Sequence, residues 1–295
     1  MMIRILGAGA GGGLPQWNCS CPQCSAARRG EIASLTQASA AVSDDGTAWV
    51  VLNASPDIRQ QLAATPALHP RQLRGSPITA VVLTNADVDH IAGLLTLREK
   101  TPFTLFATDA VLATIRANNI FGVLDPGVVT FVPITLDTAF FPLPGLRITP
   151  FAVPGKVALY LENGETPSAL TGEHTIGLTI EHGARRFDYV PGCAAISDEL
   201  IARLSQSDLV LFDGTVWQDA EMPNAGVGAK TGLRMGHVAM SGAEGSLARL
   251  ASLSARRFYT HINNTNPVLL PDSPEHREIR ARGWQLAFDG MEVSL

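Results

Sequence analysis

The sequence predicts a mixed α/β (α+β) protein in which two β-sheets pack together and helices lie outside. Short runs of β-branched and apolar residues, typical of strands, occur in two batches, one ending near Ala107 and one beginning near Ile176. Segments with helical spacing of apolar residues lie among these strands. The chain has 295 residues, 46% of them hydrophobic, which is enough to bury a large core.

The first half of the chain predicts strands that give way to alternating strands and helices. Asp44-Asp45-Gly46 is a hairpin turn signal between two apolar runs. A proline in the first turn indicates a helix that starts at Pro56. The expected strands are residues 3–6, 38–42, 48–52, 78–83 and 103–107, and the expected helices are 56–62, 90–97 and 109–118.

The second half predicts a similar set of elements. Ser241-Gly242-Ala243-Glu244 reads as a capping box that opens a helix running to about Leu253. Ser273-Pro274-Glu275 opens a last helix. The expected strands are residues 176–181, 186–190, 209–212, 257–260 and 284–288, the last of which closes the chain. Since no linker or repeat is evident, we expect a single domain over residues 1–295.

Charge and hydropathy exclude some classes of function. The net charge of −5 and the pI near 5.8, with no basic run, argue against nucleic-acid binding. No apolar run approaches the roughly 20 residues that span a bilayer. The N-terminal apolar run is too short for a signal peptide, so the expectation is a soluble cytoplasmic protein.

The segment from Gly7 to Gly12 matches the dinucleotide-binding pattern G-x-G-x-x-G. That pattern requires a helix immediately after it, whose N-terminus holds the pyrophosphate. Here Leu14, Pro15 and a cysteine-rich loop follow instead. We therefore reject nicotinamide binding and expect the glycines to allow a close backbone approach near the functional site.

Three cysteines lie together in a loop at about residues 18–25. Cys19, Cys21 and Cys24 are spaced so that their sulfurs converge on one ion, and thiolates favour zinc in a structural site. The alternative is three incidental thiols. Local spacing shows no fourth ligand. Cys193 stands alone and reads as a buried small hydrophobe.

The segment from Leu83 to Leu94 has the form of a strand-to-helix metal loop, His-x-His-x-Asp-His, with its first half altered. Asn85 and Asp87 stand where histidines would complete a two-metal site, whereas Asp89 and His90 remain. Metal binding is the favoured function of this remnant. The alternatives are that Asp89 caps the following helix and that His90 is a core histidine.

Three further residues are candidates because they follow predicted strands or sit in a glycine-rich loop. His261 ends a strand and is followed by polar residues, which favours metal ligation over a core position. Asp213 ends another strand, where it either orients a metal-bound histidine or satisfies a turn. His237 is favoured for substrate contact or proton transfer over a plain loop role.

These residues resemble the metallo-β-lactamase superfamily over the whole chain. More narrowly, the sequence resembles the pyrroloquinoline quinone biosynthesis protein B family. Four segments carry this resemblance: Gly11 to Cys19 with the cysteines after it, Asn53 to Arg59, Met235-Gly236-His237, and His261 to Pro267. The resemblance implies a four-layer αβ/βα sandwich of two mixed sheets, with metals at one edge.

The resemblance also implies which metal ligands survive. Those of the second metal fall on Asp89, His90 and His261, while those of the first are lost at Asn85 and Asp87. The nearest candidate for a further histidine is His174, and a bridging carboxylate is missing near Cys193. In related phosphodiesterases a histidine closes the cysteine-bound zinc, and Asn264 stands at that position here.

Two histidines and one carboxylate are the ligand set of non-heme iron(II) oxygenases. A two-zinc hydrolase instead needs two ions about 4 Å apart. The family resemblance implies an iron(II)- and O₂-dependent hydroxylase that acts on the tyrosine ring of a cross-linked glutamate–tyrosine intermediate. A non-catalytic carrier of the quinone or its precursor and a single-metal hydrolase remain the alternatives.

That substrate carries carboxylates, for which basic and amide side chains are candidate partners. Lys230 and Arg234 lie in a glycine-rich segment and would form charge-assisted hydrogen bonds, and Arg59 is a further candidate. Asn263 is a candidate for substrate contact or for support of the metal ligands. The alternative for the glycine-rich segment is a solvated loop. The sequence leaves the oligomeric state open, a homodimer included.

Overall fold

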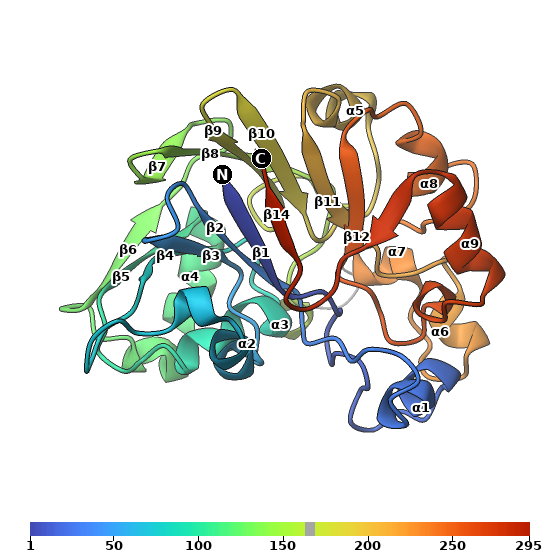
Figure 1. The fold of residues 1–295 in the computed structure, drawn as a ribbon, viewed down its shortest axis with the longest axis horizontal. Coiled ribbons are helices and arrows are strands. Elements are labelled where there is room, and N and C mark those ends of the chain that lie inside the picture. Colours follow the sequence, from blue (N-terminus) through green and yellow to red (C-terminus); the bar gives the residue numbers. More distant parts are fainter. Residues whose placement is uncertain (163–168) are drawn as a thin grey trace.

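The computed structural model describes residues 1–162 and 169–295. Two seven-stranded sheets face each other, and helices cover their outer surfaces (Figure 1). The two chain ends meet, because the Met1 amino group donates to the Leu295 carbonyl over 2.8 Å. The prediction of two packed mixed sheets with outer helices is therefore confirmed.

The first sheet is formed mainly by the first half of the chain. Its order is β14 (Glu292–Ser294), β1 (Met2–Gly7), β2 (Ser39–Ser43), β3 (Trp49–Leu52), β4 (Ile78–Val82), β5 (Phe103–Ala107) and β6 (Val129–Pro133). Strands β3 to β6 run parallel, and β14, β1, β2 and β3 pair antiparallel. The carboxyl ends of β3, β4, β5 and β6 therefore lie along one edge.

The second sheet repeats this arrangement with the second half of the chain. Its order is β13 (Trp284–Leu286), β12 (Arg256–Thr260), β11 (Leu209–Asp213), β10 (Arg185–Val190), β9 (Ile176–His182), β8 (Leu146–Ala152) and β7 (Phe140–Leu143). Strands β10 to β13 run parallel and the others antiparallel. Asp213 and Thr260 are register partners, so the segments after β11 and β12 leave the sheet side by side.

Most helices are short. The α-helices are α1 (Pro22–Arg28), α2 (Ile58–Ala64), α3 (Val88–Ile91), α4 (Asp109–Ala117), α5 (Asp198–Leu204), α6 (Glu221–Asn224), α7 (Gly232–Met235), α8 (Ser246–Arg249) and α9 (Pro274–Ala281). The 3₁₀ helices are η1 (Pro66–Leu68), η2 (Ala92–Leu95), η3 (Asn119–Val123), η4 (Leu159–Leu161) and η5 (Pro267–Leu269). Among the described residues, no helix is long and apolar enough to cross a membrane.

Alternation along the strands places apolar side chains on both faces of the first sheet. In β3, Val50 and Leu52 join the core shared with the second sheet, whereas Val51 packs under the outer helices. In β4, Val82 likewise joins the core between the sheets, and Val81 packs under the outer helices. Because side chains alternate with period two, near-continuous apolar strands of this kind predict a sheet covered on both faces.

The predicted strands are all present within one or two residues, but the predicted helix from Ser241 to Leu253 is wrong. Only α8 forms there, and its N-cap is Gly245. Gly242 adopts a left-handed φ of 89°, which ends any helix begun at Ser241. The Ser241 hydroxyl donates to the Trp217 carbonyl instead of capping.

The chain end also differs from the prediction. The strand expected at 284–288 stops at Leu286, and a separate strand, β14, closes the chain in the other sheet. A turn with Gly290 at a φ of 82° separates the two strands. The Asp289 carboxylate anchors this turn by accepting from the Thr36 amide and hydroxyl. Besides β14, three strands, β6, β7 and β8, have no counterpart in the prediction.

Candidate metal centre

Two loops from opposite sheets bring the predicted metal ligands together. Asp89 and His90 lie in α3, directly after β4, and His261 directly follows β12. The ligand atoms of these three residues lie within 4.8 Å of one another. Asp89 Oδ2 and His261 Nε2 are 3.0 Å apart. The two sheets thus bring two histidines and one carboxylate together at the edge that they share.

His90 has a buried ring nitrogen that no donor within residues 1–162 and 169–295 contacts. Its ring is 1% exposed, and Nδ1 lies 2.7 Å from Asn85 Oδ1, an acceptor. Burial lowers the pKa of His90 to about 4, so the ring is neutral, with Nδ1 protonated and a lone pair on Nε2. Nε2 is buried and has no hydrogen-bond partner among the described residues. Such an orphaned acceptor is costly unless a cation binds it.

Asn85 stands where the superfamily pattern has a histidine, and here it orients its neighbours. Its Oδ1 accepts from the Asp87 amide over 3.0 Å as well as from His90. Its Nδ2 donates to Asp87 Oδ2 over 2.9 Å. Burial and the nearby Asp89 charge raise the pKa of Asp87. A neutral amide bonded to a carboxylate makes a poor second metal site.

Asp89 is held inside the helix and does not cap it. The N-cap position of α3 belongs to Asp87, which makes no side-chain cap bond, so the capping alternative for Asp89 is wrong. Burial alone would raise the pKa of Asp89, but the neighbouring imidazole of His90 and the hydrogen bond with His261 outweigh it and lower the pKa. A Cβ on Gly11 would lie 3.4 Å from Asp89 Oδ2, so the glycine segment approaches the site closely, as expected.

A hydrogen-bonded cluster supports His261 from behind. Thr215 Oγ1 lies 2.8 Å from His261 Nδ1 and donates to Asp213 Oδ1 over 2.6 Å. Asp213 Oδ2 lies 2.7 Å from His237 Nδ1. The rings of His237 and His261 stack with centroids 5.0 Å apart. Burial alone would lower the pKa of His261, but its hydrogen bond with Asp89 outweighs this and raises it.

The cysteine segment forms a second candidate metal site. The sulfurs of Cys19, Cys21 and Cys24 lie within 4.8 Å of one another, and the thiols are free. Burial and the neighbouring Cys24 thiol raise the pKa of Cys21 to about 11, so a bound cation would be needed to hold these thiols as thiolates. Asn264 Nδ2 lies 3.3 Å from Cys24 Sγ. Unlike the predicted loop, the segment from Pro22 onward is helical.

The remaining candidates lie in different surroundings. Lys230 is half-buried, and Arg234 donates to both carboxylate oxygens of Glu162 over 3.0 and 2.7 Å. Asn263 is buried and donates to Thr265 Oγ1 over 2.6 Å. His174 belongs to none of the metal-ligand clusters found among the described residues. In the described part of the chain, none of these four side chains is hydrogen-bonded to Asp89, His90 or His261 or belongs to their cluster.

The segment from Asn53 to Arg59 supports the metal loop from the neighbouring strand. Asn53 Oδ1 accepts from the Thr84 amide over 2.9 Å, at the end of β4. The Ala54 amide donates to the His90 carbonyl over 2.7 Å, and the Gly93 amide donates to the Ala54 carbonyl over 2.8 Å. These bonds hold α3 against β3.

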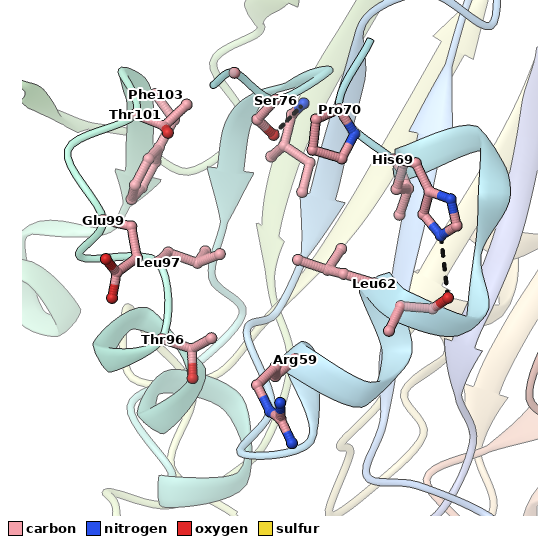
Figure 2. Close-up of a pocket in the computed structure, with 14 residues that line it drawn as sticks. Arg59, Leu62, His69, Pro70, Ser76, Thr96, Leu97, Glu99, Thr101 and Phe103 are labelled. Atoms are coloured by element: carbon pink, nitrogen blue, oxygen red, sulfur yellow. Dashed lines mark hydrogen bonds between the residues drawn. The ribbon is translucent and has the colours of Figure 1, made fainter. Parts of the chain in front are cut away.

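A separate cavity of about 310 Å³ lies on the outer side of the first sheet (Figure 2). Its walls include Leu62, Leu97 and Phe103, and Arg59 lies among the lining residues. His69 Nε2 lies 3.0 Å from the Ala63 carbonyl. None of the candidate metal ligands lines this cavity, and Arg59 lies on its wall, so neither the cavity nor Arg59 is given a part in the chemistry.

Comparison with known proteins agrees with this geometry. Residues 48–262 match the model of the beta-lactamase superfamily domain. A protein of Methylobacterium sp. (strain 4-46) called coenzyme PQQ synthesis protein B is 55% identical, with both chains covered in full. The chain belongs to the coenzyme PQQ synthesis protein B family.

Solved structures show the same fold. A structure of zinc-bound PqqB from Methylobacterium extorquens superposes with a TM-score of 0.98 at 53% identity, covering 100% of both chains. A diphosphatase of the PhnP family superposes with a TM-score of 0.70 at 22% identity, covering 99% of this chain and 96% of that one. The first likeness extends to a metal-bound PqqB, whereas the second concerns the fold alone.

Sequence reasoning missed two residues of this PqqB-like site. Thr215 contacts both Asp213 and His261, yet it looks like an ordinary turn threonine after Asp213-Gly214. The Lys156 side chain is only 10% exposed, and its Nζ lies 3.4 Å from Glu162 Oε1. Its positive charge lowers the pKa of Asp87 and so partly offsets the increase caused by burial. A lysine directly after Pro154-Gly155 was the available signal, but nothing local indicated its burial.

Proposed function

We propose that this chain is a metal-dependent enzyme of PQQ synthesis that hydroxylates the tyrosine ring of a cross-linked glutamate–tyrosine intermediate. The relatives support the pathway, because proteins 55% and 53% identical to this chain are named for PQQ synthesis or as PqqB. The observation that carries the chemistry is the convergence of Asp89, His90 and His261, with His90 Nε2 buried and unpartnered. This is the ligand set of non-heme iron(II) oxygenases.

These donors fit a divalent ion of borderline hardness such as iron(II), which would be held by Asp89, His90 and His261. When bound, the ion would supply O₂ binding and activation beside the substrate. Each hydroxylation replaces one ring hydrogen by a hydroxyl group. The second oxygen atom of O₂ leaves as water, with two electrons from an external reductant and two protons.

The neighbouring side chains have separate proposed roles. His237 is held at Nδ1 by Asp213 and stacks on His261, which suits it to move a proton or contact the substrate ring through its other nitrogen. Lys156 and Lys230 are the proposed partners of substrate carboxylates. Lys156 and Arg234 are both already paired with Glu162, so a substrate carboxylate must displace Glu162 to bind either of them.

The cysteine segment has a structural role in this proposal. Cys19, Cys21 and Cys24 would hold zinc, with Asn264 facing the fourth position. Because the catalytic ligands come from both halves of the chain, we also propose that residues 1–295 act as one domain.

The test is oxygen consumption by anaerobically purified protein loaded with iron(II), supplied with the cross-linked dipeptide and ascorbate. We expect O₂ uptake with a product heavier by the added oxygen, and a loss of at least about 100-fold in the His90→Ala variant. His69→Ala, which removes a histidine outside the site, should retain activity. Full turnover with zinc alone and no O₂ would contradict the proposal.

A different outcome would favour the carrier alternative. The Asp89→Asn and His261→Ala variants would then bind the dipeptide as tightly as the wild type, which would show that binding does not need the metal ligands. The iron-loaded wild type would also consume no O₂. If binding is lost in both variants, the carrier alternative is excluded.

A further inference from the structure

The Asp213 carboxylate has no capacity left to bind a metal. Its Oδ1 accepts from the Thr215 amide over 3.0 Å and from the Thr215 hydroxyl over 2.6 Å. Its Oδ2 accepts from the Cys193 amide over 2.9 Å and lies 2.7 Å from His237 Nδ1. A carboxylate has about four acceptor positions. Asp213 is fully buried, and all of these positions are taken by donors.

Because Asp213 only accepts hydrogen bonds, it sets the direction of the hydrogen bonds made by Thr215. Thr215 Oγ1 has one proton and two acceptors in reach, Asp213 Oδ1 at 2.6 Å and the His261 carbonyl at 3.0 Å, and the nearer, charged Asp213 is the stronger acceptor. The hydroxyl proton therefore goes to Asp213. Oγ1 then accepts from His261 Nδ1, which lies within hydrogen-bond distance at 2.8 Å. His261 consequently carries a proton on Nδ1, so its Nε2, 3.0 Å from Asp89, would bind an ion shared with that carboxylate.

We infer that Thr215 is a positioning residue, which relays the Asp213 charge to His261 and so fixes the tautomer in which His261 binds the metal. Asp213 fixes His237 directly and His261 through this hydroxyl. Partners that hold the second nitrogen of a metal-bound histidine commonly contribute about 10- to 100-fold in metal affinity. The inference rests on the proposed metal site and assigns a role to a residue outside the ligand set.

The test measures manganese(II) affinity, because this ion prefers oxygen and imidazole donors and leaves the thiolates to zinc. Free manganese(II) is followed by electron paramagnetic resonance in protein that holds one equivalent of zinc. We expect Thr215→Val, which removes only the hydroxyl, to weaken binding about 10- to 100-fold. Thr215→Ser, which restores the hydroxyl, should return affinity to within about threefold of wild type.

Thr179→Val is the matched control. Thr179 is another buried threonine whose hydroxyl donates to a buried aspartate, Asp188, between β9 and β10. Its loss should affect folding without affecting manganese(II) affinity. If Thr215→Val weakens binding no more than Thr179→Val does, the inference is overturned. If wild-type protein binds no manganese(II), the failure lies in the proposed metal site.

A measurement on wild-type protein keeps the inference testable if Thr215→Val does not fold. In the zinc-saturated protein labelled with ¹⁵N-histidine, the His261 ring should show a proton on Nδ1 that exchanges slowly with water. A His261 ring without a proton on Nδ1 would overturn the inference.

Discussion

At the scale of single residues, positions that bind a metal in two-metal relatives have another role in this chain. Asn85 occupies one such position, and its amide orients His90 and engages Asp87. An amide cannot replace a neutral histidine as a strong ligand for a soft or borderline ion. The local chemistry thus supports one ion held by Asp89, His90 and His261.

Asn264 gives a prediction at this scale. Its Nδ2 lies 3.3 Å from Cys24 Sγ and 3.6 Å from Cys21 Sγ, beside the open face of the three sulfurs. Since histidine is a stronger zinc ligand than an amide, Asn264→His should slow zinc release to a chelator at least about tenfold. Asn264→Leu, which is similar in size but has no donor atom, should accelerate release. Equal release rates in all three proteins would show that this side chain does not face the ion.

At the scale of elements, short helices and tight contacts place the ligands. Helix α3 spans four residues, too few to be stable alone, and packing holds it in place. Gly93, just after it, allows this packing, because a Cβ there would lie 2.2 Å from the Ser55 carbonyl oxygen. The position of His90 therefore depends on a glycine three residues away.

Gly93→Ala should consequently destabilise the protein by about 1–3 kcal/mol and weaken metal binding, since the clash pushes α3 away from β3. Thermal unfolding and manganese(II) titration measure the two effects. Gly122→Ala is the matched control, because a Cβ there meets nothing within 4 Å, and its stability should change by less than about 1 kcal/mol. Similar unfolding temperatures for the two variants would contradict the packing argument.

At the scale of the whole molecule, the metal site joins the two sheets. Asp89 follows a strand of the first sheet and His261 a strand of the second, 172 residues later. An ion bound between them would add a cross-link that the unfolded chain lacks. Metal binding should then stabilise both halves together.

Metal at about 100 times its dissociation constant should raise the free energy of unfolding by about 2.7 kcal/mol. For a chain of this size the unfolding temperature should rise by about 5 °C in a single transition. Differential scanning calorimetry with manganese(II) measures the shift, and Asp89→Asn should abolish it. Two transitions, only one of which moves, would contradict the single-domain proposal.

The sequence by itself determined most of the strands, the covered sheets and the candidate ligands. These depend on alternation, turn residues and short spacings, all of which act within a few residues. The cysteine spacing and the altered histidine loop are local in the same sense. The capping box at Ser241 failed because Gly242 takes a left-handed backbone conformation, which the local pattern does not reveal.

Only the tertiary structure decided how these pieces meet. Packing of the two sheets sets Asp89 against His261, and it sets Asn264 against Cys24, 240 residues away in the chain. It also brings the Thr215 hydroxyl within hydrogen-bond distance of both Asp213 and His261. Contacts between loops of different sheets depend on the register and packing of the strands that carry them, which no local spacing encodes.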